Sequence, residues 1–339
     1  MAPDPAASRL CGHRQAAIAP RARAVVLWTL AATSLGACPI TDEAHEAPPA
    51  PHDADARIAA APPDLPPAPP ASPSERLLGQ HPARLAQGGP ERALYATDPA
   101  SNALLVYDST LTLIQAVPDF GAPLGVAVNA QGVVFVGSRS RHTIETYARD
   151  GGRRVFVPAG IVQMPNDLAF DTRGNLWVVD SVANRVLVFL PDGRWLRSLG
   201  AGADTPSAFS FPVAIALSGR AVYIADQGHS HIQVFDLDAN FLGTLGEPAR
   251  DLGDLTPGRF ARLQSLALDA RGRLHALDSA LGRIQVFDPA SGKVVATYGE
   301  PGMAPGNLGT PLDILIDDRG RTLVADYGQR RITRMDEVR

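Results

Sequence analysis

The sequence predicts an all-β fold, a β-propeller of four-stranded blades with six blades as the preferred count. A short apolar segment recurs five times, an Asn/Asp-x-x-Gly turn follows four of the copies, and further strands follow each turn. Successive copies begin 42, 47, 51 and 48 residues apart. Four short strands in a repeat of about 40 to 50 residues are typical of a propeller blade.

The first strand of each repeat is the recurring apolar segment, which we expect to line a central channel. Its copies are Gly125–Asn129, Asp167–Asp171, Ala214–Ser218, Ser265–Asp269 and Asp313–Asp317. The fourth residue of the following turn often needs a positive φ, which glycine adopts without steric cost. The glycines at this position are Gly132, Gly174, Gly272 and Gly320.

The second strand of most repeats ends at an acidic residue, and a basic residue follows five positions later, where the third strand begins. Because this pattern recurs, it predicts ion pairs across hairpins that support the architecture, rather than catalytic residues. Such pairs can also satisfy loop backbone groups. The predicted pairs are Asp180 with Arg185, Asp278 with Arg283, and Asp326 with Arg331.

The two ends of the array leave the blade count open. The earliest copy, Leu94–Val117, shows only the later strands, and the last copy ends at Met335 without a fourth strand. We expect an N-terminal strand within residues 75–92 to close a ring of six blades, with five or seven as alternatives. Closure matters because an open edge strand invites aggregation.

Residues 1–37 have the features of a secretory signal. Four arginines lie in the first 23 residues, and an apolar run extends from Ala24 to Ala37. This run is shorter than the roughly 20 residues that a membrane-spanning helix needs. It ends in Leu35-Gly36-Ala37-Cys38, which resembles a bacterial lipobox. An ordinary signal peptide with a chance cysteine is the alternative.

The lipobox resemblance implies a lipid anchor at Cys38 and a location in the cell envelope. Pro39, where inner-membrane lipoproteins carry aspartate, favours the outer membrane. Residues 39–74 contain 11 prolines in 36 positions, so we expect residues 38–90 to form a disordered Pro/Ala-rich tether. The propeller is then expected to occupy residues 91–339.

The repeats resemble NHL repeats. The segments Ile232–Phe235 and Ile284–Phe287 both read Ile-Gln-Val-Phe, and Phe120 precedes Pro123 as Phe209 precedes Pro212. This resemblance covers residues 93–336. There is also a distant similarity to the gluconolactonase/regucalcin family, which are metal-dependent lactonases on a six-bladed propeller. It rests on Pro165-Asn166, and it implies a metal-ligand role for Asn166.

Departures from the repeat point to a site at the channel mouth. NHL repeats usually begin the first strand with glycine, whereas two copies here begin with Asp167 and Asp313. In a six-bladed ring these residues face each other across the channel. Together with Asn166 and Gln264, they are candidate ligands for Ca²⁺ or another divalent cation. They are equally consistent with solvated residues that bind turn amides.

Two loops between second and third strands also stand out. The segment Arg139-Ser140-Arg141-His142 concentrates positive charge, and we expect Arg139, Arg141 and His142 to contact an anionic partner, with a solvated loop as the alternative. His229 lies in the corresponding loop two residues before His231. Two such histidines can share a metal, but the sequence shows no evident third ligand. His231 stands where other repeats have arginine, and it is expected to pair with Asp226.

Composition excludes several functions. The formal net charge of −4 does not suit a nucleic-acid binder that works through bulk positive charge. The two cysteines cannot build a disulfide framework, and motifs for nucleotide, nucleophile or haem chemistry are absent. The sequence favours a non-catalytic binding or scaffold module for a protein or glycan partner. A divalent-metal-dependent hydrolase or lyase with its site in the channel is the alternative, and a plain spacer is a third.

Overall fold

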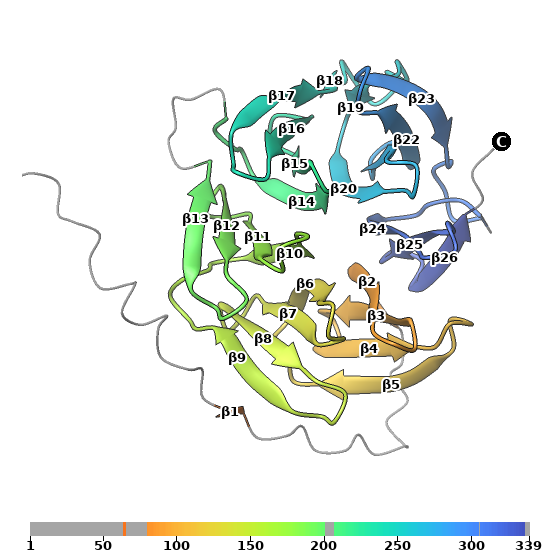
Figure 1. Cartoon of the computed structure of the whole chain (residues 1–339). Coiled ribbons are helices and arrows are strands. Elements are labelled where there is room, and N and C mark those ends of the chain that lie inside the picture. Colours follow the sequence, from red (N-terminus) through yellow and green to blue (C-terminus); the bar gives the residue numbers. More distant parts are fainter. Residues whose placement is uncertain (1–63, 66–79, 201–206, 305, 336–339) are drawn as a thin grey trace, which may run out of the picture. The chain divides into compact units, whose positions relative to one another are not determined.

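The computed structural model describes residues 64–65, 80–200, 207–304 and 306–335. Six β-sheets surround a central channel like the blades of a propeller (Figure 1). This arrangement confirms the predicted fold class and the count of six blades. Within the described residues there is no helix long and apolar enough to cross a membrane. The predicted signal segment, Cys38 and most of the predicted tether lie outside the described residues.

In each blade, consecutive antiparallel strands run from the channel to the rim in chain order. Blade 1 contains β2 (Arg84–Gly88), β3 (Ala93–Asp98), β4 (Ala103–Tyr107) and β5 (Leu113–Pro118). Blade 2 contains β6 (Pro123–Val128), β7 (Val134–Ser138), β8 (Thr143–Tyr147) and β9 (Arg153–Val157). Blade 3 contains β10 (Pro165–Phe170), β11 (Leu176–Asp180), β12 (Arg185–Phe189) and β13 (Trp195–Leu199).

The second half of the ring follows the same plan. Blade 4 contains β14 (Pro212–Leu217), β15 (Ala221–Asp226), β16 (His231–Asp236) and β17 (Phe241–Leu245). Blade 5 contains β20 (Leu263–Leu268), β21 (Leu274–Asp278), β22 (Arg283–Asp288) and β23 (Lys293–Tyr298). Blade 6, as far as it is described, contains β24 (Pro311–Ile316), β25 (Thr322–Asp326) and β26 (Arg331–Met335).

The N-terminal strand exists, but its expected role is wrong. β2 lies within residues 75–92, yet it pairs with β3 as the innermost strand of blade 1. The propeller therefore starts before the predicted boundary at residue 91. The ring closes by packing of blade 6 on blade 1 through an apolar cluster, because strands of both blades bury side chains there. This cluster includes Leu85, Leu94, Leu105, Leu323 and Ala325.

Two short ladders lie outside the blade plan. β1 (Asp64–Leu65) comes from the predicted tether and pairs with β9 at the outer edge of blade 2. Between blades 4 and 5, β18 (Glu247–Pro248) pairs in parallel with β19 (Arg259–Phe260). Figure 1 places β18 and β19 toward the outer side of the ring. These two strands of the long connection from Gly246 to Leu263 therefore lie away from the channel.

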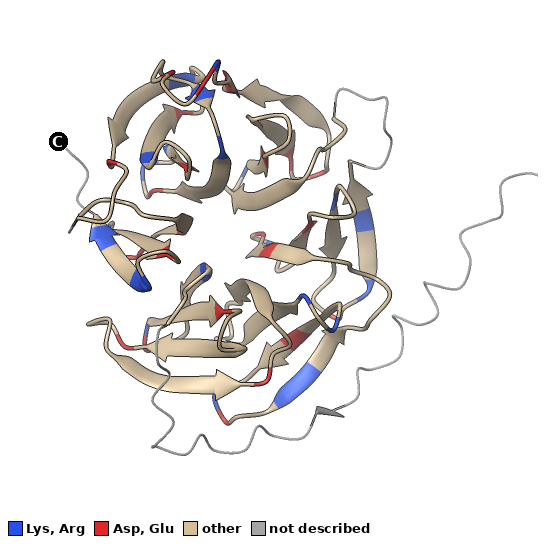
Figure 2. Ribbon diagram, turned by 180° about the vertical axis from the view of Figure 1, so that it is seen from behind, with Lys and Arg blue, Asp and Glu red and all other residues tan. Residues whose placement is uncertain are grey.

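Apolar packing between neighbouring blades forms the core. Both faces of a blade are covered, so the middle strands are apolar on both faces, and all five residues of β11 are buried. Between blades 3 and 4, Trp177 packs with Ile224 and Phe235. Charged residues colour mainly the turns and outer strands, whereas the inner strands are mostly uncharged (Figure 2). The charged side chains of the inner strands are therefore the exceptions to explain.

The turn between the second and third strands has the same backbone in every blade. The residue just before the third strand has φ between 50° and 58° in all six blades. This left-handed conformation costs least for glycine and asparagine. The six residues are Asn102, His142, Asn184, Ser230, Gly282 and Arg330. Differences between these turns therefore come from their side chains.

Candidate functional site

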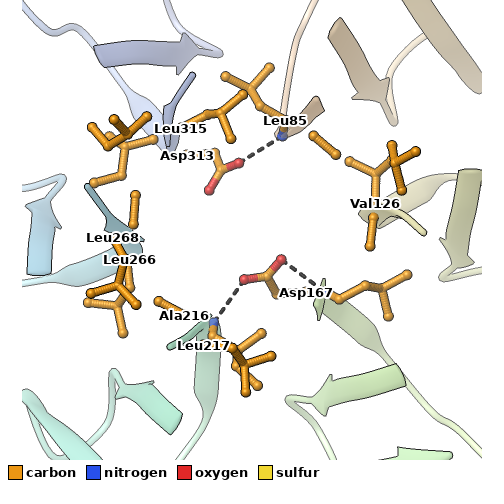
Figure 3. A pocket seen from close by; sticks show the side chains of 17 residues that line it. Leu85, Val126, Asp167, Ala216, Leu217, Leu266, Leu268, Asp313 and Leu315 are labelled. Carbon is orange, nitrogen blue, oxygen red and sulfur yellow. Dashed lines mark hydrogen bonds between the residues drawn. The ribbon is translucent and has the colours of Figure 1, made fainter. Parts of the chain in front are cut away.

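The central channel contains a cavity of about 270 Å³, lined by the inner strands of all six blades. Asp167 of β10 and Asp313 of β24 point toward one another across it, and the surrounding side chains are apolar (Figure 3). The structure thus brings together the two carboxylates that the sequence placed on opposite sides of the channel. From them the cavity extends toward the C-terminal ends of the inner strands, where Leu217 and Leu268 line it.

Each carboxylate connects its own blade to a neighbouring blade through hydrogen bonds, and Asp313 reaches both of its neighbours. Asp167 accepts hydrogen bonds from the amides of Leu168 and, in blade 4, Ile215, both at 2.9 Å. Asp313 accepts one from the amide of Leu85 in blade 1 at 2.7 Å and one from the Ser265 hydroxyl in blade 5 at 2.5 Å. The inner edge of an innermost strand has no neighbouring strand, so its amides need such partners.

An arginine that the sequence analysis assigned to the tether lies beside these carboxylates. Arg84 begins β2, and its side chain is only 4% exposed. Its guanidinium donates to Asp313 Oδ1 at 3.0 Å, to the carbonyl of Asn166 at 3.1 Å and to that of Val213 at 2.5 Å. One side chain of blade 1 thereby contacts blades 3, 4 and 6.

A signal for Arg84 was present in the sequence. Asp98 and Ser138 occupy the same position in consecutive repeats. Gly125 begins the recurring apolar segment of blade 2. The residue that precedes it by the same distance as Asp98 precedes Ser138 is Leu85, next to Arg84. The first strand of blade 1 is thus where the repeat requires it, but it lacks the Asn/Asp-x-x-Gly turn that marked the other copies.

Burial and the charge of Arg84 together set the protonation and net charge of the two channel carboxylates. Burial raises the pKa of Asp167 to about 7, the nearby charge of Asp313 adds to the rise, and Arg84 opposes it. Burial also raises the pKa of Asp313, against the effect of Arg84. Near neutral pH the pair therefore carries less than two negative charges, and Arg84 balances much of that charge. This balance reduces the attraction for a divalent cation.

The other two candidate channel ligands are engaged in local hydrogen bonds. The side-chain amide of Asn166 donates to the Val213 carbonyl at 3.1 Å. The Gln264 side-chain carbonyl accepts from the side chain of Gln227 at 3.0 Å. Both residues lie beside the start of an inner strand, as predicted, but their side-chain hydrogen bonds join blades 3 to 4 and 4 to 5.

The predicted acid–base pairs have the expected register, since Asp180, Asp278 and Asp326 each lie opposite the predicted arginine. Of these three predicted pairs, only Asp180 and Arg185 form an ion pair within the described residues, at 3.2 Å. Arg283 donates instead to the carbonyls of Leu255 and Arg259, and Arg331 donates to the Thr333 hydroxyl. The prediction is thus wrong for two pairs.

The acidic residues have a different shared role. Asp278 accepts from the amides of Ala261 and Arg262, and Asp326 from those of Gly309 and Thr310. Each carboxylate thus fixes the segment that leads into its own blade. The backbone amides satisfy the carboxylates, which frees the long arginine side chains to reach loop carbonyls.

A second cavity, of about 510 Å³, opens between blades 2 and 3 at the end that carries the second-to-third-strand turns. Arg139 and His142 line it together with apolar side chains of the connection to blade 3 and of its turn. These are Val162, Met164 and Val182. His142 Nδ1 lies 2.6 Å from the Gln163 carbonyl, and Val182 is 55% exposed. We call this hollow the blade 2–3 pocket.

Not all of the predicted contact residues belong to that pocket. Arg141 forms ion pairs with Asp119 and Glu145, so its charge is balanced within blade 2. His229 lies in the corresponding turn of blade 4, where its Nδ1 is 2.8 Å from Asp226 Oδ2. The structure therefore divides the predicted loops into a pocket and a separate histidine cluster.

The fold and this site define the class of protein: a six-bladed, NHL-type β-propeller with an internally charge-paired channel and a pocket on the turn face. No family model matches the chain. The chain is 26% identical to human NHL repeat-containing protein 3 over 159 residues, which cover 45% of each chain. It is 34% identical over 134 residues to mouse peptidyl-glycine alpha-amidating monooxygenase, covering 37% of this chain and 14% of that one.

Several solved structures share the fold. A gluconolactonase from Xanthomonas campestris superposes with a TM-score of 0.58 at 18% identity, covering 73% of this chain and 84% of that one. Virginiamycin B lyase from Staphylococcus aureus gives 0.56 at 13% identity, with 76% and 82% covered. An auxiliary nutrient binding protein from Bacteroides thetaiotaomicron gives 0.60 at 14% identity, with 75% and 68% covered. Such low identities show the fold alone.

Proposed function

We propose that this protein is a non-catalytic binding module of the bacterial cell envelope, anchored through lipid at Cys38, that binds a protein or glycan partner through the blade 2–3 pocket. The observation that carries the proposal is the pocket of about 510 Å³ with Arg139 and His142 on its wall. This volume lies within the range of about 300 to 1,000 Å³ that is usual for ligand sites.

The lining of the pocket indicates the chemistry of the partner. Arg139 is exposed and supplies a guanidinium, which binds carboxylates and phosphates with two parallel hydrogen bonds. Met164 and Val182 supply apolar surface beside it. An acidic group next to an apolar side chain matches this combination, which favours a peptide segment over a glycan.

The lactonase-like alternative has less support. It requires a metal held by Asn166, Asp167 and Asp313, yet Arg84 donates to Asp313 at 3.0 Å and Asn166 donates to Val213. A cation in the channel would have to compete with a guanidinium that the chain itself supplies.

Site-specific photocrosslinking in bacterial cells tests the pocket. A photoreactive residue at Val182 should give a discrete adduct, whereas one at Leu242, which is similarly exposed but lies on the outer strand of blade 4, should not. Adding Arg139→Glu should weaken the Val182 adduct by about tenfold, because a like charge then faces the acidic partner. Equal adducts from both positions, or none from Val182, would refute the proposed pocket.

Metabolic labelling with palmitate tests the anchor separately. The wild-type protein should incorporate the label and fractionate with the outer membrane, and Cys38→Ser should abolish both. An unlabelled wild-type protein would contradict the anchor without bearing on the pocket.

A further inference from the structure

The turn of blade 4 gathers three groups that can ligate a metal. Asp226 ends β15, His231 begins β16 directly opposite it, and His229 lies in the turn between them. One ligand atom from each of these residues lies within 4.8 Å of the other two. The sequence showed the two histidines, and the hairpin register supplies the missing third ligand.

The carboxylate of this cluster is held firmly. Asp226 is completely buried. Its Oδ1 accepts from the Ser210 amide at 2.9 Å, and its Oδ2 accepts from the Gln233 side chain at 2.9 Å. Gln233 lies two residues after His231 on the same face of β16, and its amide nitrogen also donates to the Ala208 carbonyl. Hydrogen bonds that orient a ligating carboxylate in this way are usual around metal sites.

Two buried polar atoms beside Asp226 lack partners. Within the part of the chain that the structure describes, His231 Nε2 and Gln233 Oε1 are buried without a hydrogen bond. Such groups are rare in folded proteins and call for an explanation, such as an ion or a water molecule. A metal could bind a ring nitrogen of His231, and a water on that metal could donate to Gln233 Oε1.

The two histidines differ in their exposure to solvent, and this difference suits a site that binds a metal ion and exchanges it with solvent. His231 is only partly accessible, and its Nε2 is buried. The side chain of His229 is 47% exposed, so the cluster opens to solvent on one side. The two rings are nearly parallel, with 18° between their planes and 5.5 Å between their centroids.

We propose that Asp226, His229 and His231 form a binding site for a first-row divalent transition metal, with Zn²⁺ as the preferred ion. Two imidazoles and one carboxylate suit Zn²⁺ better than Ca²⁺ or Mg²⁺, which prefer oxygen ligands alone. Three protein ligands leave a fourth, solvent-facing position for water. This site is independent of the channel carboxylates and of the blade 2–3 pocket.

Metal entry requires a small rearrangement. His229 Nδ1 and Asp226 Oδ2 are 2.8 Å apart and share a hydrogen bond. Two ligand atoms on a tetrahedral zinc, each about 2.0 to 2.1 Å from it, are farther apart than this. His229 is exposed and lies in a turn, so its ring can shift while the buried Asp226 stays in place. Ligation through Nδ1 replaces this hydrogen bond, and the proton of the neutral imidazole then resides on Nε2.

Titration of the metal-free, full-length protein with Zn²⁺ tests the site, with calorimetry for affinity and the visible absorption of Co²⁺ for the ligand geometry. We expect one equivalent of Zn²⁺ to bind. His229→Ala should weaken binding about 100-fold or more, since even the loss of an orienting partner costs 10- to 100-fold. His142→Ala, at an exposed histidine in the same turn of blade 2, is the matched control and should leave binding unchanged.

A second variant guards against misfolding. His231→Arg restores the residue that blade 3 carries at this position, so the variant should fold and melt like the wild type but bind no Zn²⁺. Binding of Zn²⁺ that survives both His229→Ala and His231→Arg would overturn the proposal. So would a preference for Ca²⁺ or Mg²⁺ over Zn²⁺, or no binding by the wild type.

Discussion

Blades 3 and 4 build the same hairpin and use its carboxylate differently. In blade 3, Asp180 accepts from the amides of Gln163 and Met164 and pairs with Arg185 at 3.2 Å. In blade 4, Asp226 accepts from one incoming amide of the described residues, that of Ser210, and faces two histidines instead of an arginine. The backbone has nearly the same conformation in the two turns, with φ of 50° at Asn184 and 54° at Ser230.

The basic residue decides whether the hairpin is closed or open to a ligand. Arginine carries five donors and no acceptor, so Arg185 can bind Asp180 and the Ile161 carbonyl together but never a metal. A neutral imidazole keeps a lone pair. Replacing arginine by His231 therefore changes a structural pair into a potential ligand set without changing the fold.

Arg84 contacts both blades, and its loss should have the largest effect. Its guanidinium donates to Asn166 of blade 3 and Val213 of blade 4. In Arg84→Met, the buried Asp313 keeps no charged partner, so we expect the free energy of unfolding to fall by about 3 to 5 kcal/mol. Urea denaturation measures this. A loss below about 1 kcal/mol would show that the two blades do not depend on Arg84.

Removing the carboxylates should come next. Asp180→Ala loses two amide hydrogen bonds and an ion pair, so we expect a loss of about 2 to 4 kcal/mol. Asp226→Ala loses fewer backbone contacts, so in the presence of a chelator it should cost about 1 to 3 kcal/mol. Urea denaturation of both variants decides the order. A larger loss for Asp226→Ala would contradict the inference that the hairpin of blade 4, which is open to a ligand, is less stabilised by its carboxylate than the hairpin of blade 3.

The seam between the two blades should respond to pH. Burial raises the pKa of Asp167 to about 7, so the folded state holds that proton more tightly than the unfolded chain does. Its contribution to stability is present at acidic pH and is lost as pH rises through about 7. The stability advantage of the wild type over Asp167→Asn should therefore shrink between pH 5 and pH 8, by about 2 to 3 kcal/mol. Denaturation curves at both pH values test this, and an advantage that grows would contradict the direction of the pKa shift.

Moving the histidines into blade 3 should change stability least. Ala183 and Arg185 correspond to His229 and His231, and Arg185 is 32% exposed. We expect Ala183→His with Arg185→His to cost about 1 kcal/mol, because Asp180 keeps its amide partners. This variant should bind a second equivalent of Zn²⁺, more weakly than blade 4 does because Leu187 stands in place of Gln233. Zinc stoichiometry measures it, and an unchanged stoichiometry would show that the shared turn geometry is insufficient.

Much of the architecture was predictable because propeller repeats are local. The turn glycines and the apolar inner strands depend on residues a few positions apart, so five first strands were located correctly. Blade 1 was missed in part because β2 lacks the usual turn signal. Two acid–base pairs were wrong because hairpin register fixes which residues lie opposite, but loop carbonyls from elsewhere compete for the arginine.

The sequence by itself determined the fold class, the repetition of a four-stranded blade and the positions where blades depart from the repeat, since these follow from periodic apolar patterning. Only the tertiary structure decided what those departures contact. Ring closure brings Arg84 next to Asp313, 229 residues away, and the hairpin register brings Asp226 to His229 and His231. Charge pairing and metal ligation require atoms within a few ångströms of one another, and a repeat pattern does not specify distances between blades.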